Sequence, residues 1–339
     1  MFELYTFREL ASKMTATKVK QELKRLGIMG YSRLRKEALL ELFQSTILEE
    51  GHLRASFLEA TNQEIRNLEQ AIRLDLRVPP ETWFYGYWIA QYLCVVGEDL
   101  ILHIPREVER YYEELKKDRR FWKLKSRVLQ IEQYAKACTN LYGVLTLEKF
   151  LEIMNEQSGI IVTGEEVRDC FEEREKIRGV EAFFYQDGYL VNDLLAEGMM
   201  ELEDGYRTLL EKQEGKPYYI PEKRELLCYA KPLYTEENEA FSQMLAYLHG
   251  SLQILEAEAY DLCADIQLSL RLGQSTKQVL ANCMQRGLVF SSEEEKDAFG
   301  CRLHMMHYHT RMPEHRGHTI AELHALERAG TRGMKKIKS

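Results

Sequence analysis

Residues 19–42 read VKQELKRLGIMGYSRLRKEALLEL, and this stretch carries the strongest structural signal in the chain. Apolar residues at helical spacing mark two short amphipathic segments, at residues 17–26 and 35–44. Two glycines and a serine lie between them, which indicates a connection rather than a further turn of helix. The stretch therefore predicts two short helices joined by a loop.

The charge of this region differs from that of the whole chain. The first 43 residues carry nine basic and five acidic side chains, whereas the full 339 residues have 46 basic and 54 acidic ones and a net charge of −8. Cations concentrated on one small unit are what binding to a phosphate backbone requires. Free backbone N–H groups at the start of the second helix would add to this attraction. The predicted nucleic-acid-binding residues are Lys18, Lys20, Lys24, Arg25, Tyr31, Arg33, Arg35 and Lys36.

The same stretch also resembles a known family. Residues 10–11, 19–28 and 30–42 are similar to the N-terminal domain of the Rho transcription terminator and to the related SAP modules, which are helix–extended loop–helix units. The resemblance implies nucleic-acid binding and leaves DNA and RNA open. It does not extend to the helicase motor of Rho, since the chain has no G-x-x-x-x-G-K-[ST] motif. The remainder resembles uncharacterised bacterial proteins that carry such a module, which implies no activity.

Two alternatives stay open for the basic segments. A helical module of this size often carries a basic face that is only solvated, and some modules of this fold bind proteins. Residues 116–127 form a second basic segment around Phe121 and Trp122. Basic residues interleaved with aromatic ones can bind nucleic acid, but the pattern slightly favours a long helix with a buried aromatic stripe and a solvated opposite face.

The middle of the chain has the order of a winged helix. Residues 145–154 show helical spacing, and Thr163 with Glu166 three residues later predicts the start of another helix. Asp187-Gly188 then separates two apolar runs, which indicates a hairpin in which Phe183 or Phe184 is buried. A small α+β interaction domain with the same order of elements is the alternative.

Helical spacing dominates elsewhere, so the predicted fold class is mainly α, with an N-terminal helix–extended loop–helix module, a central winged-helix-like unit and a C-terminal helical body. A charged helical pattern covers residues 107–134, and Ser292 and Thr319 each begin a predicted capping box. The predicted divisions are the module at 1–50, a helical connector at 51–135, the winged-helix-like unit at 136–205, the C-terminal domain at 206–329 and a basic flexible tail at 330–339.

Motifs for catalysis or metal binding are weak. The seven cysteines lie far apart in the sequence, which predicts reduced thiols that mostly act as small core residues. His304 and His307 share a helical face, but no further ligand completes a familiar zinc pattern. The chain has no G-x-S-x-G and no H-E-x-x-H motif. We therefore expect no catalytic residue, no metal and no cofactor.

These observations favour a non-enzymatic protein of the cytoplasm that binds the phosphate backbone of DNA or RNA through its basic N-terminal module. No apolar run reaches the roughly 18 residues that a membrane span needs, so we expect no membrane partner. The alternative is an acidic adaptor, or an inhibitor of a nucleic-acid-processing enzyme, whose partner is a protein.

Overall fold

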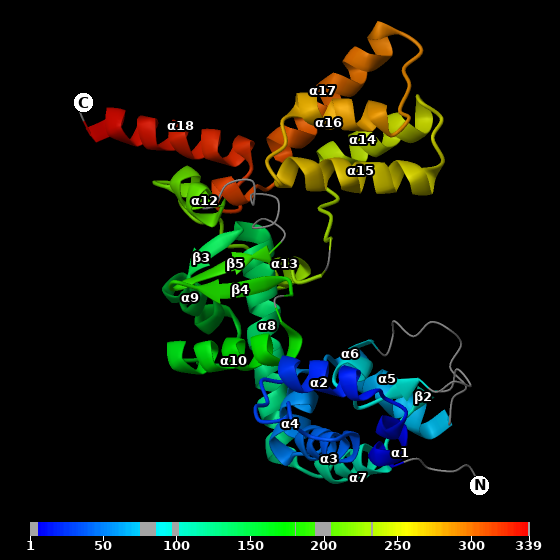
Figure 1. Ribbon diagram of the computed structural model, residues 1–339. Helices are drawn as coiled ribbons and strands as arrows, with labels where there is room; N and C mark the ends of the chain where they lie inside the picture. Colours follow the sequence, from blue (N-terminus) through cyan, green and yellow to red (C-terminus); the bar gives the residue numbers. More distant parts are fainter. Residues whose placement is uncertain are drawn as a thin grey trace. The chain divides into compact units, whose positions relative to one another are not determined.

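The computed structural model describes residues 6–74, 86–96, 102–179, 181–193, 205–231 and 233–337. These residues are mainly helical, with one two-stranded and one three-stranded antiparallel sheet (Figure 1). The chain divides into two compact units. Unit 1 comprises residues 1–130 and 172–179, and unit 2 comprises residues 131–171 and 180–339.

Unit 1 is a helical assembly that contains the two helices predicted from residues 17–44. Its elements in order are α1 (Phe7–Ser12), α2 (Ala16–Arg25), α3 (Lys36–Ile47), α4 (Glu50–Glu59), α5 (Asn62–Leu74), α6 (Gly86–Ala90), β1 (Val95–Val96), β2 (Leu102–His103), α7 (Arg106–Leu115) and the first half of α8 (Arg119–Tyr142). One hydrophobic core joins Phe7 and Phe43 to Phe57, Trp88 and Phe121. The first 50 residues therefore share a core with the helices that follow them, and the predicted boundary at residue 50 marks no break in packing.

The charged pattern at residues 107–134 forms two helices where one was expected. Asp118 ends the turn after α7, and its carboxylate accepts hydrogen bonds from the backbone N–H groups of Arg120 (2.9 Å) and Phe121 (3.1 Å). A carboxylate in that position caps a new helix N-terminus, because the first N–H groups of a helix have no partner within it. The chain therefore starts α8 there instead of continuing α7.

Lys125 of α8 is buried within unit 1. Its ammonium group donates to the carbonyl oxygens of Phe57 (2.8 Å), Leu58 (2.9 Å) and Ala60, at the end of α4. These carbonyls lack partners within α4, so the lysine completes the C-terminal end of that helix and ties α8 to it. Phe121, one turn earlier on the same face, is also buried, which confirms the buried stripe predicted for this segment at that residue.

Unit 2 begins with the second half of α8 and contains the three-stranded sheet. The elements that follow are β3 (Val144–Thr146), α9 (Leu147–Gln157), α10 (Gly164–Arg178), β4 (Phe183–Gln186) and β5 (Tyr189–Asn192), and the strand order in the sheet is β3-β5-β4. The residues of α10 from Glu172 onwards belong to unit 1. The predicted hairpin is confirmed, because β4 and β5 pair antiparallel and Phe183 is only 2% exposed. Asp187 and Gly188 form its turn with positive φ values of 51° and 88°, which suits the Asp-Gly pair.

The strand β3 was not predicted. The sequence pattern assigned residues 145–154 to one helix, but Val144, Leu145 and Thr146 pair with Val191, Leu190 and Tyr189 of β5. Helix α9 starts only after Thr146, whose hydroxyl accepts the backbone N–H of Lys149 at 3.2 Å. The predicted cap at Thr163 is confirmed by the same kind of bond from the backbone N–H of Glu166, also at 3.2 Å.

The rest of unit 2 is helical. Its elements are α12 (Gly205–Gln213), α13 (Lys223–Cys228), α14 (Glu239–Gly250), α15 (Glu256–Arg271), α16 (Thr276–Gln285), α17 (Glu293–His309), the 3₁₀ helix η2 (Pro313–His315) and α18 (Ile320–Ile337). Helices α14 to α17 pack around a core that includes Phe241, Met244 and Phe299. Helix α18 continues to Ile337, so the backbone of residues 330–337, within the predicted tail, is helical.

The seven cysteines are free thiols, as expected. Five are buried, Cys228 is half-buried and Cys301 of α17 is exposed. Burial raises the pKa values of the Cys94 and Cys138 thiols and raises that of Cys263 to about 12. These thiols therefore remain protonated and act as core residues.

Candidate functional site

The loop between α2 and α3 is the place where the predicted nucleic-acid-binding residues come together. Lys20 of α2 donates to the carbonyl oxygen of Ser32 at 2.9 Å, which fastens the loop to the helix before it. Arg35 occupies the N-cap position of α3, and its side chain makes no capping hydrogen bond. The first backbone N–H groups of α3 are therefore not capped by this side chain, at the positive end of the helix dipole.

Three cations around this loop are uncommitted. Lys24, Arg33 and Arg35 are exposed, and their side chains make no hydrogen bond or ion pair with any residue that the structure describes. Long exposed cations of this kind can reach an anionic ligand without first breaking an internal contact. We name Lys24, Arg33, Arg35 and the first turn of α3 the α2–α3 surface.

The other predicted cations already have partners. Lys18 and Arg25 both bind Glu22, with nitrogen–oxygen distances of 2.7 and 2.9 Å. Burial of Glu22 by itself raises the pKa of its carboxyl group, but hydrogen bonds from Lys18 and Arg25 outweigh it and lower this pKa to about 2. Lys36 donates to the carbonyl oxygen of Ser12 at 3.0 Å. Tyr31 is half-buried against the core of unit 1, so it contributes to packing there.

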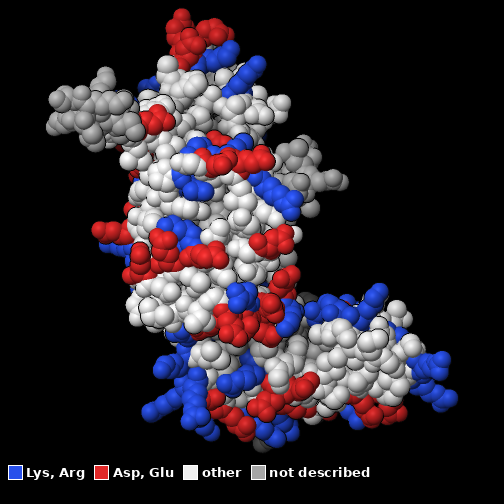
Figure 2. Space-filling view, turned by 90° about the vertical axis from the view of Figure 1, so that its left-hand side faces the viewer, with Lys and Arg blue, Asp and Glu red and all other residues white. Residues whose placement is uncertain are grey.

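Helix α10 has the opposite charge. It carries six acidic and four basic residues. Two of the four basic side chains are turned inward, since Arg174 is buried and Arg178 forms an ion pair with Glu64. The outward side of α10 is therefore acidic and repels phosphate. Figure 2 shows one face of the molecule, on which Lys and Arg side chains are interspersed with clusters of Asp and Glu.

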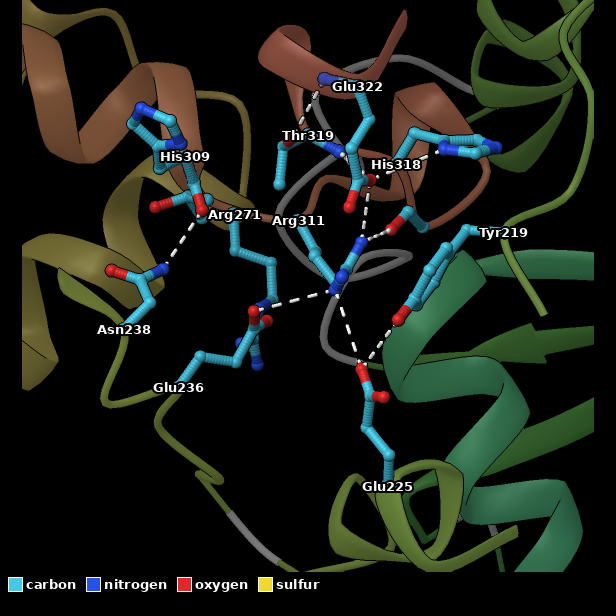
Figure 3. A network of polar contacts seen from close by, with 12 residues as sticks. Tyr219, Glu225, Glu236, Asn238, Arg271, His309, Arg311, His318, Thr319 and Glu322 are labelled. Atoms are coloured by element: carbon cyan, nitrogen blue, oxygen red, sulfur yellow. Dashed lines mark hydrogen bonds and ion pairs between the residues drawn. The ribbon is translucent and has the colours of Figure 1, made fainter. Parts of the chain in front are cut away.

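A second polar cluster in unit 2 is centred on Arg311 (Figure 3). Its guanidinium binds Glu322 at 2.7 Å, lies within 3.8 Å of Glu236 and Glu225, and stacks on the ring of Tyr219 with its central carbon 3.5 Å from the ring centroid. Burial raises the pKa of Glu236 although Arg271 and Arg311 favour its charged form. Burial also raises the pKa of Glu322, but hydrogen bonding to Arg311 outweighs this effect, so the pKa of Glu322 is lowered.

The segment that carries Arg311 is held by backbone contacts as well. Gln213 donates to the carbonyl oxygens of Tyr142 (2.7 Å) and Pro313 (2.8 Å), and the hydroxyl of Tyr142 donates to the carbonyl oxygen of Tyr219 (2.8 Å). Gly317 lies directly against Tyr142. Arg311 pairs with three carboxylates, those of Glu225, Glu236 and Glu322. These contacts hold the turn between α17 and α18.

Two of the C-terminal histidines contact neighbouring charged side chains. Nδ1 of His315 lies 3.1 Å from the Lys216 ammonium, and Nδ1 of His318 lies 3.3 Å from Glu322. Among the described residues, no three His, Cys, Asp or Glu side chains are grouped to hold a metal ion. The absence of a metal nevertheless stays a prediction that elemental analysis can test.

Comparison with known proteins adds no assignment: no family model, no curated protein and no solved structure matches the chain. Within the described part, no helix combines the length and apolar character that crossing a bilayer demands.

Proposed function

We propose that the protein binds nucleic acid, DNA or RNA, through phosphate contacts made by the α2–α3 surface. The observation that carries this proposal is the group of three exposed cations without described partners, Lys24, Arg33 and Arg35, around a helix N-terminus that lacks a side-chain cap. Arginine forms paired hydrogen bonds with phosphate oxygens, and free N–H groups at a helix start bind the same oxygens. The resemblance to the Rho N-terminal and SAP modules points to the same ligand.

The expected affinity of this surface alone is modest. Each phosphate contact releases counterions and contributes about 0.7 to 0.9 to the slope of log K against log salt concentration. Three side chains therefore account for a slope of about 2 to 3. Binding in the non-specific range of about 10⁻⁴ to 10⁻⁶ M is expected, because Glu22 keeps Lys18 and Arg25 engaged.

A second candidate function concerns the central unit of β3, α9, α10, β4 and β5. We propose that this unit is winged-helix-like, which the strand order β3-β5-β4 and the tight hairpin support. The acidic outward side of α10 favours a basic protein partner there over nucleic acid. This observation supports the adaptor function, which would use elements other than those of the α2–α3 surface.

The test is fluorescence anisotropy with labelled single- and double-stranded DNA and RNA at 50 mM salt. The variant K24A/R33A/R35A should bind about tenfold more weakly than the native chain, and its salt slope should fall by about 2 to 3. The matched control R224A/K231A/K277A removes three exposed cations elsewhere and should bind as the native chain does.

Equal losses in both variants would attribute binding to net charge and refute the site. Absence of binding by the native chain to all four nucleic acids would reject nucleic-acid binding in favour of the protein-adaptor function.

A further inference from the structure

The start of α8 carries a second group of exposed cations. Lys117, Arg119, Arg120 and Lys123 are exposed, and their side chains make no hydrogen bond or ion pair within the described residues. The nearest acidic group in the sequence, Asp118, is committed to Arg54 (3.4 Å) and to the backbone of α8. The Asp118 carboxylate therefore does not neutralise these four cations. We name these four residues the α8 surface.

Helix stability does not explain these residues. Arg119 and Arg120 stand in the first turn of α8, which holds no acidic residue. A cation there opposes the helix dipole, which favours negative charge at an N-terminus. Lys123 lies four residues after Arg119 and three after Arg120, and like charges at these spacings repel. A sequence selected for helix stability alone would place acidic residues here, so the cations point to an anionic ligand.

The packing of α8 turns these cations outward. Phe121 and Lys125 are buried on the side of the helix that faces the core of unit 1. At 100° per residue, Arg119 and Lys123 lie on the opposite side of the helix and Arg120 lies near them. The bonds from Lys125 to the end of α4 hold this part of α8 in place. The α8 surface is therefore a firmly held group of outward-facing cations.

We propose that the α8 surface is a second phosphate-binding surface of the protein, and that nucleic acid long enough to reach both surfaces of unit 1 engages the α2–α3 surface at the same time. This inference rests on the proposed nucleic-acid binding. Once the nucleic acid is bound at one surface, its binding to the other surface is an intramolecular step. The two weak surfaces together therefore bind more tightly than either alone. The preferred ligand is therefore a long nucleic acid, whatever its sequence, because phosphate contacts carry no sequence information.

The experiment compares oligonucleotides of 8 and 40 nucleotides, with the native chain and the variant R119E/R120E, by anisotropy over a salt series. The variant should bind the 40-mer at least tenfold more weakly, and its salt slope should fall by at least 1.4 to 1.8, about 0.7 to 0.9 for each lost contact. Its preference for the 40-mer over the 8-mer should also decrease. Its melting temperature should stay the same or rise by a few degrees, because glutamate suits the first turn of a helix. Weaker binding by a protein of equal or greater stability is the result that a structural role for these arginines cannot produce.

The control variant R224E/K277E reverses two exposed cations elsewhere and should keep the affinity and the length preference of the native chain. If R119E/R120E binds both oligonucleotides as the native chain does while K24A/R33A/R35A binds weakly, the inference about α8 is wrong and the proposed function stands. If the native chain binds no oligonucleotide, the proposed function fails and the inference fails with it. Binding only to vesicles of phosphatidylcholine with 20% phosphatidylserine would overturn both in favour of an anionic lipid surface.

Discussion

Replacing Gly317 with alanine should destabilise unit 2 for two separable reasons. Gly317 has a φ of +80°, and a Cβ atom built there lies 3.0 Å from side-chain carbons of both Leu141 and Tyr142. The left-handed backbone costs an L-residue about 1 to 2 kcal/mol. Forcing a methyl group into a filled space costs about 1 to 3 kcal/mol more. The free energy of unfolding should therefore fall by about 2 to 5 kcal/mol.

A second glycine provides the matched control. Gly273 has a similar φ of +85°, but a Cβ atom there meets nothing within 4 Å. Gly273→Ala should therefore show the backbone cost alone, about 1 to 2 kcal/mol. The difference between the two variants measures how tightly the segment after α17 is held against the end of α8.

Urea unfolding followed by far-ultraviolet circular dichroism is the appropriate assay, because unit 2 is largely helical. Tryptophan fluorescence provides an internal comparison, since all three tryptophans lie within residues 1–130 of unit 1. If Gly317→Ala costs no more than Gly273→Ala, the close approach to Leu141 and Tyr142 relaxes freely and the reasoning is refuted.

Three further predictions concern Glu22, Lys125 and the metal content. The folded pKa of Glu22 is about 2 against an ordinary 4.5, so its stabilising contribution is present above pH 4.5 and is lost as the pH falls towards 2. Glu22→Gln should therefore lower the free energy of unfolding by about 1 to 2 kcal/mol near pH 7, after allowance for the exposure of its partners. In urea titrations, the difference in stability between this variant and the native chain should close by pH 2. The same variant removes the ion pairs of Lys18 and Arg25 with Glu22, while Arg25 keeps its bond to the carbonyl oxygen of Ala90. Nucleic-acid affinity should therefore rise, and an unchanged affinity would contradict the role given to Glu22. Lys125→Met should lower the free energy of unfolding by about 1 to 3 kcal/mol, because the carbonyl groups at the end of α4 lose a buried donor; a more stable variant in the same titrations would show that burying the charge outweighs its hydrogen bonds. Elemental analysis should find no stoichiometric metal, and a chelator should leave the melting temperature unchanged; one zinc per chain would contradict this.

Several local signals in the sequence predicted local structure. The capping box predicted at Ser292 forms only in part, because Glu295 accepts the N–H of Ser291 instead of that of Ser292. Thr163 with Glu166 and Thr319 with Glu322 begin helices as their spacing predicts, and in the second pair both reciprocal hydrogen bonds form at 3.1 Å. Asp187-Gly188 forms the hairpin turn. In each case the interacting groups are a few residues apart, so the sequence pattern contains the whole interaction.

Structure that depends on distant partners was not predictable in this way. Strand β3 exists because it pairs with β5, more than forty residues later, and its three residues alone are compatible with the start of a helix. The network of Arg311 brings together Glu225, Glu236 and Glu322 from three different segments. No spacing in the sequence indicates those pairings.

The candidate site was predictable in its location and less so in its detail. The excess of basic residues indicated the region, and the helix boundaries placed Arg35 at the start of α3. Which cations are available depends on the fold, because Lys20 and Lys36 bind carbonyl oxygens of residues twelve and twenty-four positions away. Amino-acid type alone does not distinguish these lysines from Lys24.

The distribution of the cysteines has a practical consequence for measuring these interactions. Five thiols are enclosed in the packed interior, Cys228 is half-buried, and Cys301 is exposed on α17. A maleimide reagent needs an accessible thiolate, so Cys301 is the residue that should react first under native conditions. The chain thus provides its own attachment point for a fluorophore, and the anisotropy of that dye would report on complex formation without replacing any residue.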